Sequence, residues 1–76
     1  MKHYPDFNTE ERRSFNEGED LGMNIIAEIL MGENDMFKSV KEYKYIMTQS
    51  LRQFNETESK YFVIRGQLNA ICKFEP

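Results

Sequence analysis

The 76-residue chain is poor in the residues that interrupt or cross-link a fold. Glycine and proline together number six, and cysteine occurs once, at Cys72. Because turns draw heavily on glycine and proline, this scarcity favours a few long elements over many short ones. A lone cysteine cannot form an internal disulfide, so the composition does not indicate a small secreted, disulfide-rich domain. Hydrophobic residues make up 39% of the chain, which is enough for one small core.

The chain also has little of what catalysis and metal binding require. His3 is the only histidine, so a Ser/His/Asp or Cys/His arrangement has no imidazole in a stable segment. Cys72 lies between Ile71 and Phe74, and these apolar neighbours favour a buried, inert thiol. The sequence contains no Glu-x-x-His pair, calcium-binding loop or glycine-rich phosphate loop. We therefore expect a protein that is not an enzyme, with no catalytic residue, metal site or cofactor.

Long apolar runs are missing as well. The N-terminal MKHYPDF lacks the apolar region of a signal peptide, and no apolar stretch approaches the roughly 18 residues of a membrane span. The sequence therefore predicts neither feature. A net charge of −3 argues against a general nucleic-acid binder. Lys38, Lys41, Tyr45 and Arg52 can share one helical face, but so few bases would bind nucleic acid only weakly.

Residues 1–8 are predicted to form an extended arm, because Pro5 disfavours helical backbone in the residue before it. Asn8 and Glu11 then have the spacing of a capping box. A helix is expected from this point over residues 9–31. The sequence thus predicts an arm followed by a single helical domain over residues 9–76.

The inward stripe of this first helix contains two glycines, which would let another helix backbone approach closely. Apolar or small residues recur on it at spacings of three and four. They are Phe15, Gly18, Gly22, Ile25 and Ile29. Gly32 suits the position just after the helix end, and Asn34 or Asp35 is predicted to cap a second helix. So short a connection makes the two helices antiparallel neighbours.

The second helix presents its own apolar stripe for this contact. Its predicted members are Met36, Val40, Tyr43, Met47, Leu51 and Phe54.

The segment around residues 55–59 allows two folds. Asn55 and Glu58 have the spacing of a second capping box, which indicates a break and a third helix over about 56–74. However, residues 33–65 contain no glycine or proline, and apolar residues recur every seven positions across the supposed break. These are Val40, Met47, Phe54, Tyr61 and Leu68. The heptad favours an all-α antiparallel helical hairpin with a long second helix. The alternative is a three-helix bundle with a break near residues 55–57.

A continuous second helix would extend beyond the start of the first and leave its last apolar stripe uncovered. Each large apolar side chain left in water lacks the roughly 1.5–3 kcal/mol of stabilisation that its full burial would contribute. Gly66 lies beside that stripe, in mid-helix, where glycine costs about 1 kcal/mol relative to alanine. It therefore indicates a neighbour at short range. The predicted partner interface is Tyr61, Ile64, Gly66, Leu68 and Ile71, with Tyr4 and Phe7 on an arm that docks on a neighbouring subunit.

Acidic residues suggest a different surface. Residues 9–31 hold six acids and two bases, whereas residues 32–54 hold three acids and four bases. A solvated helix face that attracts the second helix would explain this difference. Alternatively, the acids could imitate nucleic-acid phosphates or cover a basic site on another protein. The residues of this alternative acidic face are Glu17, Glu19, Asp20 and Glu28.

The run Arg65-Gly66-Gln67-Leu68-Asn69-Ala70-Ile71 resembles a pattern in small helical-hairpin proteins of tailed bacteriophages. In these, a basic residue and a glycine precede two apolar positions near the end of the last helix. The chain departs from the pattern in the aromatic pair Tyr61-Phe62 and in its acidic first helix.

The resemblance implies a minor virion or assembly and packaging component in the virion or host cytoplasm. Such a protein acts through a protein partner or self-association. The acidic face suggests the alternative, a small phage inhibitor of a host enzyme or defence system.

Overall fold

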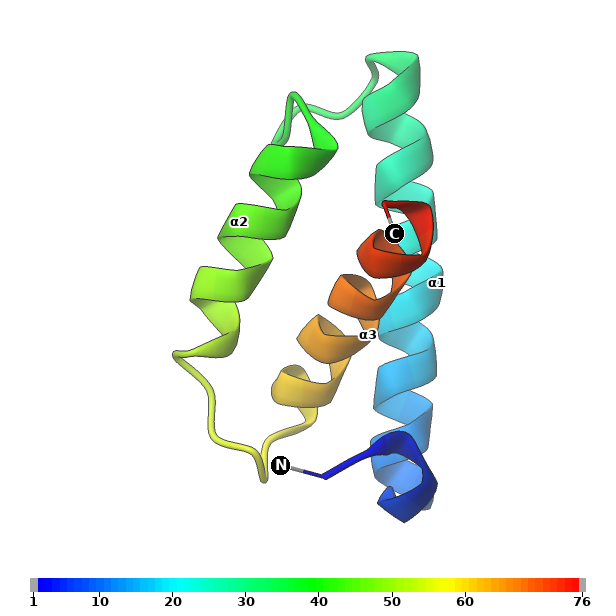
Figure 1. The fold of residues 1–76 in the computed structure, drawn as a ribbon, viewed down its shortest axis with the longest axis vertical. Coiled ribbons are helices and arrows are strands. Elements are labelled where there is room, and N and C mark those ends of the chain that lie inside the picture. Colours follow the sequence, from blue (N-terminus) through cyan, green and yellow to red (C-terminus); the bar gives the residue numbers. More distant parts are fainter. Residues whose placement is uncertain (1, 76) are drawn as a thin grey trace.

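The computed structural model describes residues 2–75 and contains three α-helices (Figure 1). Helix α1 spans Thr9–Met31, α2 spans Val40–Leu51 and α3 spans Ser59–Phe74. Helices α1 and α3 run in the same direction and α2 runs in the opposite direction, with α3 lying between α1 and α2 (Figure 1). Within residues 2–75 there is no strand, so the all-α prediction is confirmed. The arm contains a short 3-10 turn at Tyr4–Asp6, so it is not extended throughout.

The favoured long second helix is wrong, because the chain breaks between Leu51 and Ser59. Glu58 is the N-cap of α3, with extended backbone. Its N–H donates to the Asn55 carbonyl at 3.0 Å, and its carboxylate accepts from the Asn55 N–H at 3.4 Å. Asn55 and Glu58 therefore contact each other at the break, but the predicted capping box is wrong, because Glu58 and not Asn55 is the N-cap and its side chain makes no capping hydrogen bond. The heptad continues across the break because residues on both sides, including Phe54 and Tyr61, enter one apolar cluster.

Helix α1 begins and ends where its capping residues predict. The Asn8 side chain accepts from the Glu11 N–H at 2.8 Å, and the Glu11 carboxylate accepts from the Asn8 N–H at 2.9 Å. Gly32 ends the helix at φ 72°, a left-handed conformation that glycine adopts without a steric penalty. The predicted bounds of this helix are confirmed.

The Glu11 carboxylate makes the stability of the fold depend on pH in the acid range. The hydrogen bond from the Asn8 backbone, together with Lys2 nearby, lowers the pKa of Glu11 below its ordinary value of 4.5. A lowered folded-state pKa stabilises the fold above about pH 4.5, and this stabilisation is lost as pH falls through the folded pKa. We expect Glu11→Gln, which can keep the capping geometry, to unfold more easily than wild type at neutral pH. The difference should disappear at low pH.

Urea unfolding at a series of pH values measures this difference. Glu10→Gln is the control, because Glu10 lies in the same turn but outside the capping box. The assignment would be contradicted if Glu11→Gln remained less stable than wild type by the same amount at pH values below the folded-state pKa of Glu11.

Helix α2 begins later than predicted. Its N-cap is Ser39, whose hydroxyl accepts from the Glu42 N–H at 3.1 Å. The Asn34 side chain instead accepts from the backbone N–H groups of Met36 and Phe37, at 2.9 and 2.7 Å, and so stabilises a turn. Met36, predicted to face inward, is 76% exposed, and Phe37 is buried.

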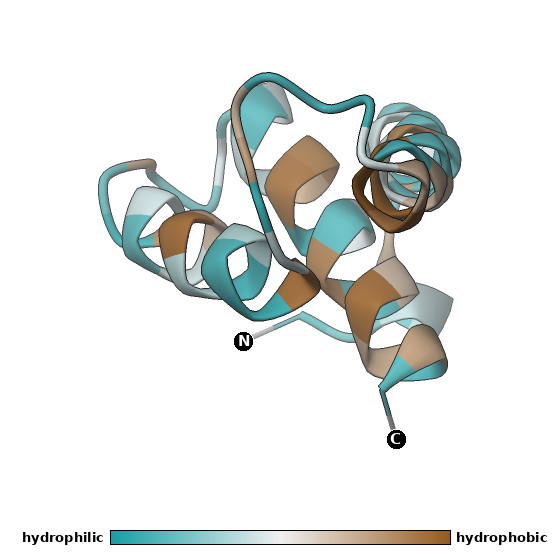
Figure 2. Ribbon diagram, turned by 90° about the horizontal axis from the view of Figure 1, so that it is seen from above, coloured by the Kyte–Doolittle hydropathy of each residue, from teal (hydrophilic) through white to brown (hydrophobic). Residues whose placement is uncertain are grey.

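Two apolar clusters form the core, and α3 contributes to both. One joins the end of α1 to the start of α2 and the end of α3. Its buried members are Ile26, Ile29, Phe37, Val40, Tyr43, Ala70 and Ile71. The other lies under the N-terminal arm and contains Phe7, Phe15, Tyr61 and Phe62. Seen from above, the apolar residues lie largely between the helices (Figure 2).

The closest helix contact joins α1 to α3, where glycines on both helices bring the backbones together. A Cβ atom added at Gly66 would collide with the carbonyl oxygen of Phe15 and lie 2.8 Å from the Glu19 nitrogen. A Cβ atom at Gly18 would collide with the carbonyl oxygen of Val63. The neighbour that Gly66 requires is therefore α1 of the same chain.

Helix α2 packs mainly on α3, so the predicted pairing of the first two helices is not the principal contact. Tyr43 of α2 is fully buried and donates its O–H to Oε1 of the buried Gln67 at 2.5 Å. Burial raises the pKa of Tyr43 well above its ordinary value. The hydroxyl therefore stays protonated and acts as a donor across the α2–α3 contact.

Candidate protein interface

The structure buries most of the residues predicted to meet another chain. Tyr61 and Ile64 are buried, Ile71 is fully inaccessible, and Gly66 is covered by α1. The expectation that these residues lack a partner within the chain is therefore wrong. The break before α3 turns this helix back onto α1 and α2, and the three helices cover one another's apolar faces.

The N-terminal arm likewise docks on its own chain. The Phe7 ring is buried, with its centroid 5.6 Å from that of Phe15 and 5.0 Å from that of Phe62. The Arg65 guanidinium lies 5.2 Å from the same ring centroid. Tyr4 remains exposed. The arm thus closes one end of the α1–α3 pair, and of its two predicted contact residues only Tyr4 is accessible.

One predicted contact residue of α3 is only partly covered by its own chain. Leu68 is half-buried and lines a shallow groove of about 360 Å³ with Tyr4, Phe7 and Cys72. The structure exposes Cys72, so the predicted buried thiol is wrong. Cys72 follows Leu68 by one helical turn. The groove also takes in Phe15 of α1 and Leu51 of α2, and Leu68 packs at the margin of the cluster that contains Tyr43.

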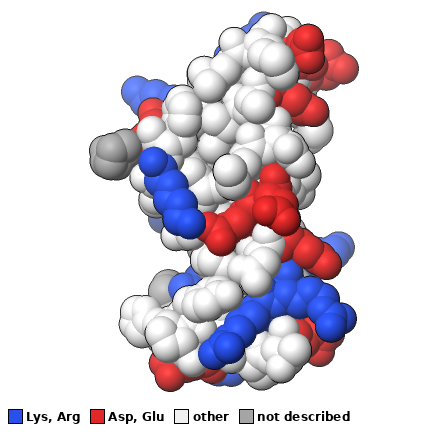
Figure 3. All heavy atoms as spheres, turned by 90° about the vertical axis from the view of Figure 1, so that its right-hand side faces the viewer, with Lys and Arg blue, Asp and Glu red and all other residues white. Residues whose placement is uncertain are grey.

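The four acids of the alternative site do not form one face. The Glu19 carboxylate lies toward α3 and pairs with Lys73 at 2.8 Å. Glu28 accepts a hydrogen bond at 2.9 Å from an amide in the loop that follows α1. Glu17 and Asp20 are exposed on α1. On the outer side of α1, acidic side chains form a band with basic side chains below it (Figure 3).

An exposed apolar surface that the sequence did not reveal lies over the later part of α1 and the end of α3. Met23 is 64% exposed, Leu30 63% and Phe74 46%. With Ala27 they line a groove of about 300 Å³ whose edge carries Lys73. We call Met23, Ala27, Leu30 and Phe74 the α1–α3 patch. A broad uncharged surface lies above the acidic band in Figure 3.

This patch had a signal in the sequence. Met23, Ala27 and Leu30 recur at spacings of four and three, which is a second helical stripe beside the inward one. The two stripes could not both face one core, and the stripe that contains Gly18 and Gly22 was the one predicted to face inward. The approach of α3 at Gly18 confirms that orientation.

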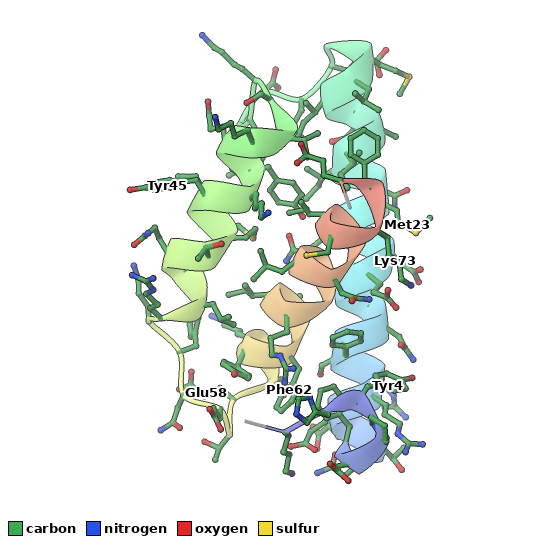
Figure 4. All side chains as sticks on the ribbon, viewed as in Figure 1. Tyr4, Met23, Tyr45, Glu58, Phe62 and Lys73 are labelled. Carbon is green, nitrogen blue, oxygen red and sulfur yellow. The ribbon has the colours of Figure 1, made fainter. Side chains whose placement is uncertain are left out.

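The outer side of α2 presents a basic surface. Lys38, Lys41, Tyr45 and Arg52 are all exposed, as expected for residues on one helical face, and we call them the α2 face. Tyr45 points away from the rest of the molecule, on the side opposite Met23 (Figure 4). The next residue, Ile46, is 40% exposed. The α2 face therefore combines apolar surface with positive charge.

No protein-family model, curated protein or solved structure matches the chain. Residues 2–75 contain no group of three or more His, Cys, Asp or Glu side chains placed to hold a metal ion. None of the helices formed by these residues is long and apolar enough to cross a membrane.

Proposed function

We propose that the chain is a non-enzymatic protein-binding module and that the α1–α3 patch is its contact surface. The observation that carries this proposal is the exposure of Met23, Leu30 and Phe74 beside one another along a single groove. Contiguous apolar surface on a small domain is typical of a surface that another protein covers. Fully burying such a side chain contributes about 1.5–3 kcal/mol, so even partial burial of three of them supports a stable contact.

The form of the groove suits a helical partner. Met23 and Leu30 stand on either side of Ala27 along α1, and the small Ala27 leaves the centre of the groove low. Phe74 of α3 forms the opposite wall. An amphipathic helix can lay its apolar face into a groove of this kind. The flexible Met23 side chain can adapt to the shape of the partner.

The wider role follows from the resemblance at residues 65–71. The chain then serves as a minor virion or assembly component of a tailed bacteriophage, acting by contact with other protein chains. The alternative, an acidic inhibitor of a host enzyme, has less support from the geometry. Two of its four acids, Glu19 and Glu28, are engaged within the chain.

Site-specific photo-crosslinking in producing cells tests the protein-binding proposal. We expect a photoreactive residue at position 23 to give discrete protein adducts. The same residue at position 21 is the control, because Leu21 is also exposed but lies outside the groove. Adduct mass separates a second copy of the chain from a different protein. The proposal is wrong if position 23 yields no more adduct than position 21.

A further inference from the structure

Apolar side chains are exposed on two opposite sides of the molecule. On one side is the α1–α3 patch. On the other, Tyr45 projects from α2. Ile46 of α2 and Met36 just before it are also exposed. Figure 4 shows Met23 and Tyr45 pointing in opposite directions. One chain therefore cannot cover its own patch with its own α2 face.

The charges around these two surfaces have opposite signs. Residues 14–31 of α1 contain four acids and no base. Residues 38–52, which cover α2, contain four bases and one acid. Lys73 at the edge of the patch pairs with Glu19, so these two charges offset each other and the negative charge beside the patch comes from the other acids, including Asp20. The patch is thus bordered by negative charge and the α2 face by positive charge.

We infer that the α1–α3 patch of one copy binds the α2 face of a second copy. This inference rests on the proposed function and names the partner. The apolar side of α2 packs in the core, so its outer side offers the Tyr45 ring to the apolar groove and the positive charges of Lys41 and Arg52 to the acidic border. Pairing two patches would instead bring Asp20 of each copy toward the acids of the other. Pairing two α2 faces would bring their bases together.

The contact is heterologous, since it joins two different surfaces. A copy that uses its patch still presents its α2 face, and the two surfaces lie on opposite sides. Such a contact does not close into a symmetric dimer, so assemblies should grow by successive addition. Their size should rise with protein concentration and fall with salt, because the charges at the border of an interface are screened.

Sedimentation velocity on the purified chain tests this with two single-sided variants. Met23→Gln with Leu30→Gln removes the apolar patch and leaves α2 intact. Lys41→Glu with Arg52→Glu reverses the α2 face and leaves the patch intact. Leu21→Gln is the control on α1 outside the groove. All five positions are exposed, and circular dichroism confirms that each variant is folded.

We expect wild type and Leu21→Gln at low ionic strength to exceed twice the monomer mass of 9.1 kDa as concentration rises. They should shrink in about 0.5 M salt. Each single-sided variant should remain a monomer, whereas an equimolar mixture of the two should form a complex of one copy each and nothing larger. A monomeric wild type, a wild type that stops at a dimer, or a mixture that stays monomeric would each overturn the inference.

These outcomes are separable from those of the proposed function. A monomeric wild type whose position 23 still crosslinks to a different protein would end the self-association proposal and leave the protein-binding module standing. Absence of any adduct at position 23 would contradict both the protein-binding proposal and the self-association proposal.

Discussion

Replacing Gly66 with alanine is expected to lower the free energy of unfolding by about 2 kcal/mol or more. The added Cβ atom would collide with the Phe15 carbonyl oxygen and approach the carbonyl carbon of Gly18 to 3.0 Å. Both groups belong to the backbone of α1, which cannot rotate aside as a side chain could. Relief of this collision requires the two helices to separate, and their packing loosens along the whole contact.

The sign of this effect distinguishes close helix packing from local helix preference. Alanine favours an isolated helix over glycine by about 1 kcal/mol, so an open site would gain stability from the change. A domain of this length has a total stability of roughly 4–11 kcal/mol. A loss near 2 kcal/mol would therefore be a large fraction of the whole.

Urea unfolding of Gly66→Ala, followed by circular dichroism, measures the loss. Ala27→Gly is the control, because Ala27 is exposed on α1, four residues before its end, and should show at most the helix-propensity loss of about 1 kcal/mol. Gly18→Ala should behave like Gly66→Ala, since its Cβ atom would collide with the Val63 carbonyl oxygen. A Gly66→Ala variant that is more stable than wild type would show that α1 and α3 are not in backbone contact.

Replacing Ile71 with alanine is expected to cost about 2–5 kcal/mol, the range for deleting a large aliphatic side chain from a core. Ile71 is fully inaccessible and packs in the cluster that contains Tyr43 and Ala70. The loss belongs to the folding of a single chain. It should therefore be the same at every protein concentration.

Chemical unfolding at two protein concentrations tenfold apart tests this origin. If Ile71 served mainly to bind a second chain, the variant would keep the stability of the monomer. It would lose only the part of the free energy of unfolding that depends on protein concentration. Leu68→Ala is the comparison, because Leu68 is half-buried at the margin of the same cluster and should lose less. An Ile71→Ala loss no larger than that of Leu68→Ala would contradict the core assignment.

Interactions between residues close together in the sequence were enough to predict several features of the structure. Asn8, Glu11 and Gly32 set the bounds of α1, because capping hydrogen bonds and a left-handed glycine act within one helical turn. The glycine at position 66 correctly indicated a close neighbour. Asn55 and Glu58 marked the break, although the heptad running through them pointed to a continuous helix.

Only the tertiary structure decided where those elements went. A period of seven is the same for one long helix and for two helices that enter a common core, so the pattern at Phe54 and Tyr61 could not separate them. The choice depends on apolar surface buried between residues far apart in the chain. Once α3 returned to α1 at Gly18 and Gly66, the stripe through Ile71 became core. The second stripe of α1, through Met23 and Leu30, was left on the surface because α3 covers only one side of that helix.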